Sequence, residues 1–211
     1  IPKNSALFFN EKNKLNKIIP SKTVGPFDTP NGKITFKENS PIIFVYDITT
    51  IQGNINTDTN IKIDNLNFLL KENSSIHINY KSMISFIKLS SETNVKFEEI
   101  ENYFSKDDNL YFTFDENNHY KLFEVVLNSS LKYRTKEKEI LFLGNSNYSS
   151  KVTFFNSGYV ESGINDEDFD ITFCKRKYTL RKGSNVTFYE SGKVKSTYIK
   201  NDFEINLNNI N

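Results

Sequence analysis

The chain has 211 residues, which is enough for one large domain or two small ones. Its 27 basic and 26 acidic residues leave a net charge of +1, so no basic excess directs it to nucleic acid or to an anionic membrane. Only 37% of the residues are hydrophobic, but 19 Phe and 11 Tyr suit the half-buried surface of a β-sheet. The composition therefore favours an all-β protein without a nucleic-acid partner.

Short segments with an apolar residue at every second position recur from the start of the chain, and this period places side chains on one face of a strand. Each segment has an aromatic or aliphatic anchor. In chain order the anchors are Phe9, Phe44, Ile78, Phe112, Phe154 and Phe188. They are 35, 34, 34, 42 and 34 residues apart, which predicts about six tandem repeats of ~34 residues.

Two turn signals divide each repeat. Before an anchor, alternating apolar residues lead to a polar pair, then Asn or Gly, then Ser, as in Ile34–Ser40, Phe68–Ser74 and Tyr178–Ser184. After the last two anchors come Asn156–Gly158 and Glu190–Gly192, whose Gly suits the positive φ of a tight hairpin turn. Each repeat is therefore predicted to contain three or four short strands, at least one pair of them forming a hairpin.

A unit of this length cannot bury its apolar face alone, whereas stacked units can. We therefore expect an all-β fold of hairpin-containing repeats, arranged as a β-solenoid, a β-roll or a long meandering sheet, with a compact sandwich ranked second. The repeats predict a single domain over residues 1–211. An insertion within 115–150 accounts for the long step between Phe112 and Phe154.

The segment Asn94–Phe104 is the best candidate for a helix. Its residues Phe97, Ile100 and Phe104 have helical spacing. The repeat favours the opposite interpretation, because it places Tyr103 and Phe104 in a strand position.

The strongest internal match lies between Lys151–Ser162 (KVTFFNSGYVES) and Asn185–Ser196 (NVTFYESGKVKS). The segment Leu180–Ser196 resembles the repeats of exported, mostly uncharacterised envelope proteins of spirochaetes. Its core, Phe188–Lys195, is distantly similar to MORN-type repeats. The good match covers residues 151–205, whereas earlier repeats share only the apolar pattern and lack the Gly of this core. The resemblance implies an exported β-repeat protein, and it implies no catalytic residues.

No apolar run reaches the roughly 20 residues needed to span a bilayer, and no signal peptide is visible. The chain starts at Ile1 without an initiator Met, which fits a mature or trimmed chain. We expect export to the periplasm or outer surface of a bacterial envelope, with a lipid anchor upstream of Ile1 as one option and a cytoplasmic location as the alternative. Cys174 is the only cysteine, so an intramolecular disulfide is excluded, and its side chain is interpreted as structural.

Three aromatic residues next to anchors are predicted to face away from the apolar face: Tyr111, Phe155 and Tyr189. Exposed aromatic side chains stack on sugars or anchor a protein partner. A sheet covered on both faces would explain them equally well. These three residues are the main candidates for a partner-binding surface.

The only basic run is Lys175-Arg176-Lys177. Its simplest interpretation is a solvated hairpin tip, and the alternative is a contact with an anionic glycan or a lipid headgroup. We keep Lys175, Arg176 and Lys177 as secondary candidates for partner binding.

Residues with catalytic or metal-binding chemistry are few. His77 should point away from the apolar face, and His119 lies in a predicted turn. The acidic clusters Asp166-Glu167-Asp168 and Asp107-Asp108 also fall at predicted turns, and Asp168 recurs as Asp202 in the next repeat, which favours a structural role. Alternate carboxylates at Asp166, Asp168 and Asp170 would suit calcium, but the Gly-rich nonapeptide pattern of calcium β-rolls is missing. We predict no catalytic residue, no metal site and no cofactor.

The sequence therefore predicts a non-enzymatic, exported or envelope-associated β-repeat protein with a binding, adhesion or scaffold role. The partner would be a protein or a glycan. One alternative is a polysaccharide-active enzyme on a β-solenoid. Another is a structural module that assembles through its edge strands. The oligomeric state does not follow from the sequence.

Overall fold

The computed structural model describes residues 1–45, 50–64, 66–114, 116–117, 120–146, 150–173 and 176–197, without the side chains of 120–122, 173 and 176. In these ranges the chain forms 22 strands and no α-helix, and hence no helix that could cross a membrane. Twelve strands form one long, meandering antiparallel sheet, and the others form one sheet of four strands and three of two. The predicted all-β fold with a long meandering sheet is confirmed.

The chain divides into two compact units, residues 1–125 and 126–211. In the first unit the long sheet contains, in hydrogen-bonded order, β1 (Ala6–Phe9), β2 (Leu15–Ile19), β5 (Ile42–Val45), β6 (Thr50–Asn54), β9 (Ser75–Ile78), β10 (Ile84–Lys88), β13 (Asn109–Phe114) and β14 (Tyr120–Val126). The short sheets of this unit are β3 (Val24–Thr29) with β4 (Gly32–Phe36), and a four-stranded sheet of β12 (Glu101–Phe104), β11 (Thr93–Lys96), β8 (Leu66–Leu70) and β7 (Thr59–Ile63).

The second unit repeats the same plan. Its long-sheet strands are β17 (Lys151–Phe154), β18 (Val160–Ile164), β21 (Asn185–Phe188) and β22 (Val194–Thr197). Its short sheets are the hairpins β15 (Leu131–Arg134) with β16 (Glu139–Phe142), and β19 (Phe169–Phe173) with β20 (Arg176–Leu180).

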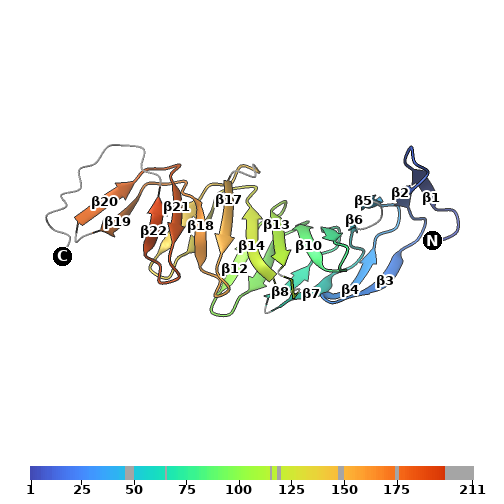
Figure 1. Cartoon of the computed structure of the whole chain (residues 1–211), viewed down its shortest axis with the longest axis horizontal. Coiled ribbons are helices and arrows are strands. Elements are labelled where there is room, and N and C mark those ends of the chain that lie inside the picture. The colour runs from blue at the N-terminus through green and yellow to red at the C-terminus, as the bar shows by residue number, and fades with distance from the viewer. Residues whose placement is uncertain are drawn as a thin grey trace. The chain divides into compact units, whose positions relative to one another are not determined.

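Successive hairpins alternate between two layers within each unit (Figure 1). The hairpin β5–β6 belongs to the long sheet, β7–β8 to a short sheet, and β9–β10 to the long sheet again. One 34-residue repeat is therefore a pair of hairpins, one for each layer. Within each unit the buried apolar side chains come from hairpins of both layers, whereas the first strand, β1, is exposed. Burial between two layers explains why the unit must be repeated to fold.

The core lies between the two layers, and in the first unit it is centred on Phe123, which is fully buried. The Phe123 ring stacks on Phe112 of the long sheet at a centroid distance of 5.2 Å. It also lies 5.5 Å from Phe97, 5.6 Å from Phe104 and 6.4 Å from Phe68. Each such aromatic pair adds about 0.5–1.5 kcal/mol beyond the burial of its area.

The predicted anchors lie on this inner face of the long sheet. Four of them are at most 6% exposed: Ile78, Phe112, Phe154 and Phe188. Phe44 is half-buried, and Phe9 is 57% exposed because it lies on β1, whose four residues are all exposed. The last four anchor positions are therefore core positions of the repeat, whereas burial is partial at Phe44 and is lost at Phe9.

Four of the long-sheet hairpins, β1–β2, β9–β10, β17–β18 and β21–β22, share a turn in which the fourth residue has a positive φ, and each has a β-bulge beside it. These residues are Asn13 (58°), Ser82 (62°), Gly158 (95°) and Gly192 (88°). The Gly that the early repeats lack is thus replaced by Asn or Ser. In the turn of Ser82, the Oδ1 atom of Asn79 accepts hydrogen bonds from the backbone amides of Lys81 and Met83, at 2.9 and 3.0 Å.

The helix candidate Asn94–Phe104 is a β-hairpin. Its residues belong to β11 and β12, which pair from Thr93 with Phe104 to Lys96 with Glu101. The repeat predicted this strand position for Tyr103 and Phe104, and the helical spacing of Phe97 and Phe104 is incidental. Both rings are buried against Phe123. Phe104 reaches it from the strand β12, and Phe97 reaches it from the turn after β11.

The long step between Phe112 and Phe154 retains the plan of one hairpin for each layer. The strand β14 has seven residues, whereas the equivalent strand β10 has five. The short-layer hairpin β15–β16 has two strands of four residues, like β11–β12. The extra length therefore enters between the elements and in β14, within the range where an insertion is predicted.

Two glycines of the long sheet, Gly53 and Gly163, lie directly against aromatic rings of the short-sheet layer. A Cβ atom on Gly53 would lie 2.7 Å from Cδ1 of Phe36, and one on Gly163 would lie 2.6 Å from Cδ1 of Phe142. Both rings are at most 1% exposed, so they have little room to move. The absence of a side chain on the long sheet is what allows these rings to lie beneath it.

We predict that Gly53→Ala lowers the free energy of unfolding by about 1–3 kcal/mol, because the added methyl group overlaps the buried Phe36 ring. Urea unfolding followed by circular dichroism measures the loss. The double variant Gly53→Ala/Phe36→Leu should lose less than the sum of the two single variants, since the smaller side chain makes room for the methyl group. Strictly additive losses would contradict the predicted contact.

Candidate functional site

A continuous row of side chains crosses the outer face of the long sheet in the first unit. In each repeat it begins with the residue just before the anchor, which points away from the core because strand side chains alternate. Register pairs join these residues across seven neighbouring strands: Phe8, Lys17, Ile43, Gln52, His77, Phe86 and Tyr111. We call this set the outer row.

Three rings at the end of the outer row contact one another. The His77 and Phe86 centroids are 4.4 Å apart, and those of Phe86 and Tyr111 are 5.0 Å apart. The ring planes are tilted by 44° and 55°. All three side chains are half-buried, so each ring contacts its neighbour and still presents part of its surface to solvent.

Phe86 reaches the outer row through a β-bulge. The pairing register of β10 shifts between Ile84 and Phe86, so that Ile84 pairs with Ile78 while Phe86 pairs with His77. Ile84 is fully buried and Phe86 faces outward, although the two are separated by one residue. The bulge thus reverses the face on which the rest of β10 presents its side chains.

A groove of about 470 Å³ follows these rings. Its polar lining consists of the Gln52 amide, the Ser75 and Ser85 hydroxyls and the Lys88 ammonium. Hydroxyl, amide and ammonium groups beside aromatic rings form an amphipathic surface, with apolar faces for contact and polar groups that fix orientation.

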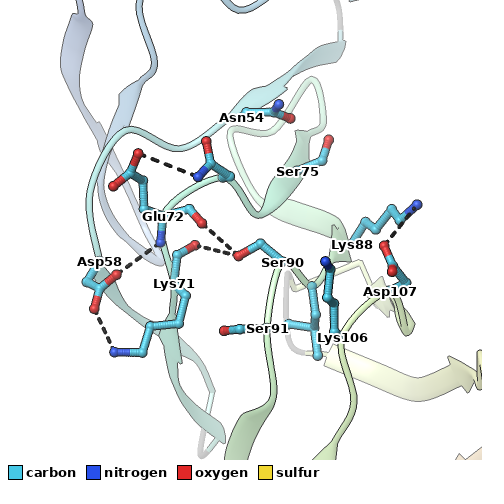
Figure 2. Close-up of a pocket in the computed structure, with 12 residues that line it drawn as sticks. Asn54, Asp58, Lys71, Glu72, Ser75, Lys88, Ser90, Ser91, Lys106 and Asp107 are labelled. Carbon is cyan, nitrogen blue, oxygen red and sulfur yellow. Dashed lines mark hydrogen bonds and ion pairs between the residues drawn. The ribbon is translucent and has the colours of Figure 1, made fainter.

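A second, more polar hollow of about 750 Å³ adjoins this groove and shares Ser75 and Lys88 with it. Figure 2 shows its lining, which comes mainly from the turns that join the two layers. The Ser90 hydroxyl lies in the hollow and donates to the backbone carbonyl of Glu72 at 2.7 Å. We call the groove and the hollow together the outer groove.

The charged groups of the hollow are mostly paired. Lys71 Nζ lies 2.7 Å from Asp58 Oδ2, and Lys88 Nζ lies 3.5 Å from Asp107 Oδ1. Glu72 pairs with a lysine from an earlier repeat at 2.6 Å. Among the residues drawn in Figure 2, Lys106 has no dashed contact. Three lysines and three carboxylates line the hollow, so it has no excess of either sign.

His77 is the one group of the ring cluster whose ordinary pKa lies near neutral pH. Burial lowers the pKa of His77 below its usual 6.5, because the charged form loses solvation between the neighbouring strands. Its Nε2 atom is buried and makes no hydrogen bond within the described part of the chain. At neutral pH the ring is therefore uncharged, and it acts as an aromatic side chain with an unused polar atom.

The sequence-predicted aromatic residues occupy two different positions in the repeat. Tyr111 lies in the middle of β13 and belongs to the outer row. Phe155 and Tyr189 directly follow β17 and β21, and they occupy equivalent hairpin turns, where the amide of each donates to a carbonyl four residues on. Tyr189 is 54% exposed and Phe155 is half-buried.

In the second unit the outer-row positions are occupied by hydroxyl residues. The register pairs are Thr153 with Ser162, Ser162 with Thr187, and Thr187 with Ser196. The Thr153 and Ser162 hydroxyls lie 2.8 Å apart. The two units thus share a backbone position but differ in the chemistry that it carries.

The basic run lies mostly outside the described side chains. Lys175 is outside the described residues, as is the Arg176 side chain, although Arg176 begins β20. Lys177 is exposed on that strand, where it pairs with Thr172. Cys174 and His119 also lie outside the described residues.

Two of the acidic residues form the same turn-stabilising contact in different repeats. Asp58 accepts hydrogen bonds from the Lys71 ammonium and from the backbone amide of Glu72, at 2.7 and 3.0 Å. Asp168 accepts equivalent hydrogen bonds from the Arg181 guanidinium and from the backbone amide of Lys182, at 2.6 and 2.7 Å. These partners lower the pKa of both carboxyls; the largest effect comes from the Lys71 side chain for Asp58 and from a backbone amide for Asp168.

The other acidic candidates also have partners. Asp166 lies 2.7 Å from the Lys182 ammonium and accepts a hydrogen bond from Ser130 at 2.7 Å; these contacts lower its pKa. Asp170 accepts one from Thr179, and the buried Asp108 accepts one from the Ser105 amide. Within the described residues, no group of three His, Cys, Asp or Glu side chains is arranged to hold a metal ion.

No protein-family model, no curated protein and no solved structure matches this chain. The site is therefore interpreted from its own geometry. Sequence reasoning found Tyr111 but missed Phe86 and Gln52. The sequence does contain a signal for this row: the residue before each anchor faces outward, and its partners are found on the neighbouring strands rather than next to it along the chain.

We predict that acid destabilises the protein partly through His77. Its pKa is lower in the folded than in the unfolded chain, so the unfolded state takes up a proton first, and stability is lost as pH falls below about 6.5 through the folded pKa. His77→Phe retains a ring but cannot be protonated, so urea unfolding should show a smaller loss of stability between pH 7.5 and pH 5. Equal losses in the two proteins would contradict this assignment.

Proposed function

We propose that this chain is a non-enzymatic, exported or envelope-associated β-repeat protein that binds a macromolecular partner through the outer groove. The observation that carries this proposal is the ring cluster of His77, Phe86 and Tyr111 on the face of the long sheet opposite the core. A fold of this kind needs only its inner face to be apolar. Three contacting rings on the outer face are therefore explained better by contact with a partner than by folding.

The location in an envelope rests on the resemblance of Leu180–Ser196 to exported repeat proteins of spirochaetes. The alternation of hairpins agrees with a repeat protein of that kind, because each repeat adds the same pair of hairpins to an extended face. Extended repeat surfaces commonly serve binding rather than catalysis.

The carboxylates support a binding role over hydrolysis of a polysaccharide. A glycoside hydrolase needs a general acid whose pKa is raised, opposite a second carboxyl group. Asp58, Asp166 and Asp168 have lowered pKa values, because each is held by cationic side chains and hydrogen bonds. These three residues are suited to stabilise turns rather than to donate protons.

Self-association through β1 is the second candidate function. Among the described strands, β1 pairs only with β2, and Leu7 and Phe9, which face the inner side of the sheet, are 43% and 57% exposed. An edge strand with exposed apolar residues is a template for pairing with another chain. The partner in this case would be a second copy of the protein.

The binding proposal predicts a difference between two double variants. Phe86→Ser/Tyr111→Ser removes two rings of the outer groove, whereas Phe155→Ser/Tyr189→Ser removes the two turn aromatics. Biolayer interferometry against immobilised polysaccharides and purified extracellular-matrix proteins should show saturable binding by the native chain. We expect about tenfold weaker binding for the first variant and little change for the second.

Thermal unfolding must first show that both variants are folded. Equal binding by the native chain and the Phe86/Tyr111 variant would refute the outer groove as the binding surface. A native chain that binds nothing on either panel would refute the binding role itself.

Self-association predicts a mass that rises with concentration. Light scattering after size exclusion should show species above 24.5 kDa at high concentration. Phe9→Lys places a charge on the exposed edge strand and should return the protein to a monomer. A native chain that is monomeric throughout would contradict this second candidate.

A further inference from the structure

We infer that the outer groove binds an uncharged oligosaccharide chain that lies across β9, β10 and β13. This inference rests on the proposed function, and it assigns the chemical class of the partner. It follows from four properties of the groove: its rings, its polar fringe, its charge balance and the state of the backbone beneath it.

The rings supply apolar contact in a form that suits sugars. His77, Phe86 and Tyr111 come from three neighbouring strands, and their centroids are separated by 4.4 and 5.0 Å. Sugar rings have apolar C–H faces and polar edges, so they contact an aromatic surface while their hydroxyls stay free to form hydrogen bonds. A row of rings across the strands offers consecutive contacts to a chain of sugars.

Polar side chains lie directly beside the rings. Gln52 lies next to His77 in the outer row, and Ser75 and Ser85 line the same groove. The buried Nε2 atom of His77 has no hydrogen-bond partner in the described part of the chain. An unpaired buried polar atom is unfavourable, so a ligand hydroxyl that reaches it forms a hydrogen bond that the protein itself does not supply.

The charges of the groove argue for an uncharged partner. Its lysines and carboxylates are equal in number, and two of the three lysines are paired with Asp58 and Asp107. A polyanion would have to compete with these carboxylates and would meet no field of opposite sign. A basic peptide would meet the lysines in the same way.

The backbone beneath the rings leaves no place for a peptide strand. β10 is paired on both sides, with β9 and with β13, so its amides and carbonyls are already used in the ladders. Extended peptides commonly bind by adding a strand to a free edge, which does not exist at this point of the sheet. Recognition here must therefore come from side chains, and hydroxyl-rich sugars can be held by aromatic rings and polar side chains without a free strand edge.

The test uses isothermal titration of the full chain with defined hexasaccharides. The neutral probes are cellohexaose, maltohexaose and chitohexaose, and a heparin hexasaccharide is the anionic comparison. We expect saturable binding of at least one neutral probe, binding about tenfold or more weaker in Phe86→Ser/Tyr111→Ser, and weaker binding of heparin in every case.

The chain offers a matched control for the loss of two aromatic rings. Tyr80 and Tyr103 are 73% and 58% exposed and lie outside the outer groove, so Tyr80→Ser/Tyr103→Ser should bind like the native chain. Tyr111→Phe keeps the ring and should retain most of the affinity. Thermal unfolding of each variant separates a binding defect from a folding defect.

The outcomes also separate this inference from the proposed function. If a matrix protein binds the native chain but not Phe86→Ser/Tyr111→Ser, and no neutral probe binds, the assignment of an uncharged oligosaccharide is wrong and the binding role is retained. Preferential binding of heparin would do the same. Neutral-probe binding that the double variant retains would overturn the site assigned here and, with it, the outer groove of the proposed function.

Discussion

The whole structure depends on the fact that a β-hairpin with one apolar face cannot bury that face by itself. This chain meets the requirement by alternating hairpins between two layers, so that each hairpin is covered by its neighbours in sequence. The contacts of Phe123 with Phe68, Phe97, Phe104 and Phe112 show how one ring joins both layers. Burial of the inner face is thus strictly local along the chain, and the outer face is left free to vary.

The period, the strand content and the core positions could be predicted from the sequence, because they depend on short-range alternation and on the spacing of anchors. Ile78, Phe112, Phe154 and Phe188 are buried as the repeat requires. The turns were also accessible in part. At Ser82 a non-glycine residue adopts the positive φ, and support from the Asn79 side chain explains why Gly is not needed there.

The candidate site could be predicted only in part, and the reason is the bulge in β10. Counting alternate residues from the buried Ile84 places Phe86 in the core, whereas the structure turns it outward beside His77. A sequence pattern does not report which strand residues face each other once the register shifts. Tyr111 was recognised because it adjoins an anchor on a strand without such a shift.

The bulge also limits how this protein can change in length. In four long-sheet hairpins, β1–β2, β9–β10, β17–β18 and β21–β22, the returning strand is out of step with its partner by one residue, so removal of a single residue at the turn would exchange the outer and inner side chains of that strand. Ile84 and Ile87 would then face solvent and Phe86 the core. Within such a hairpin, a substitution on the outer face leaves the core in place, whereas the insertion or deletion of a single residue does not.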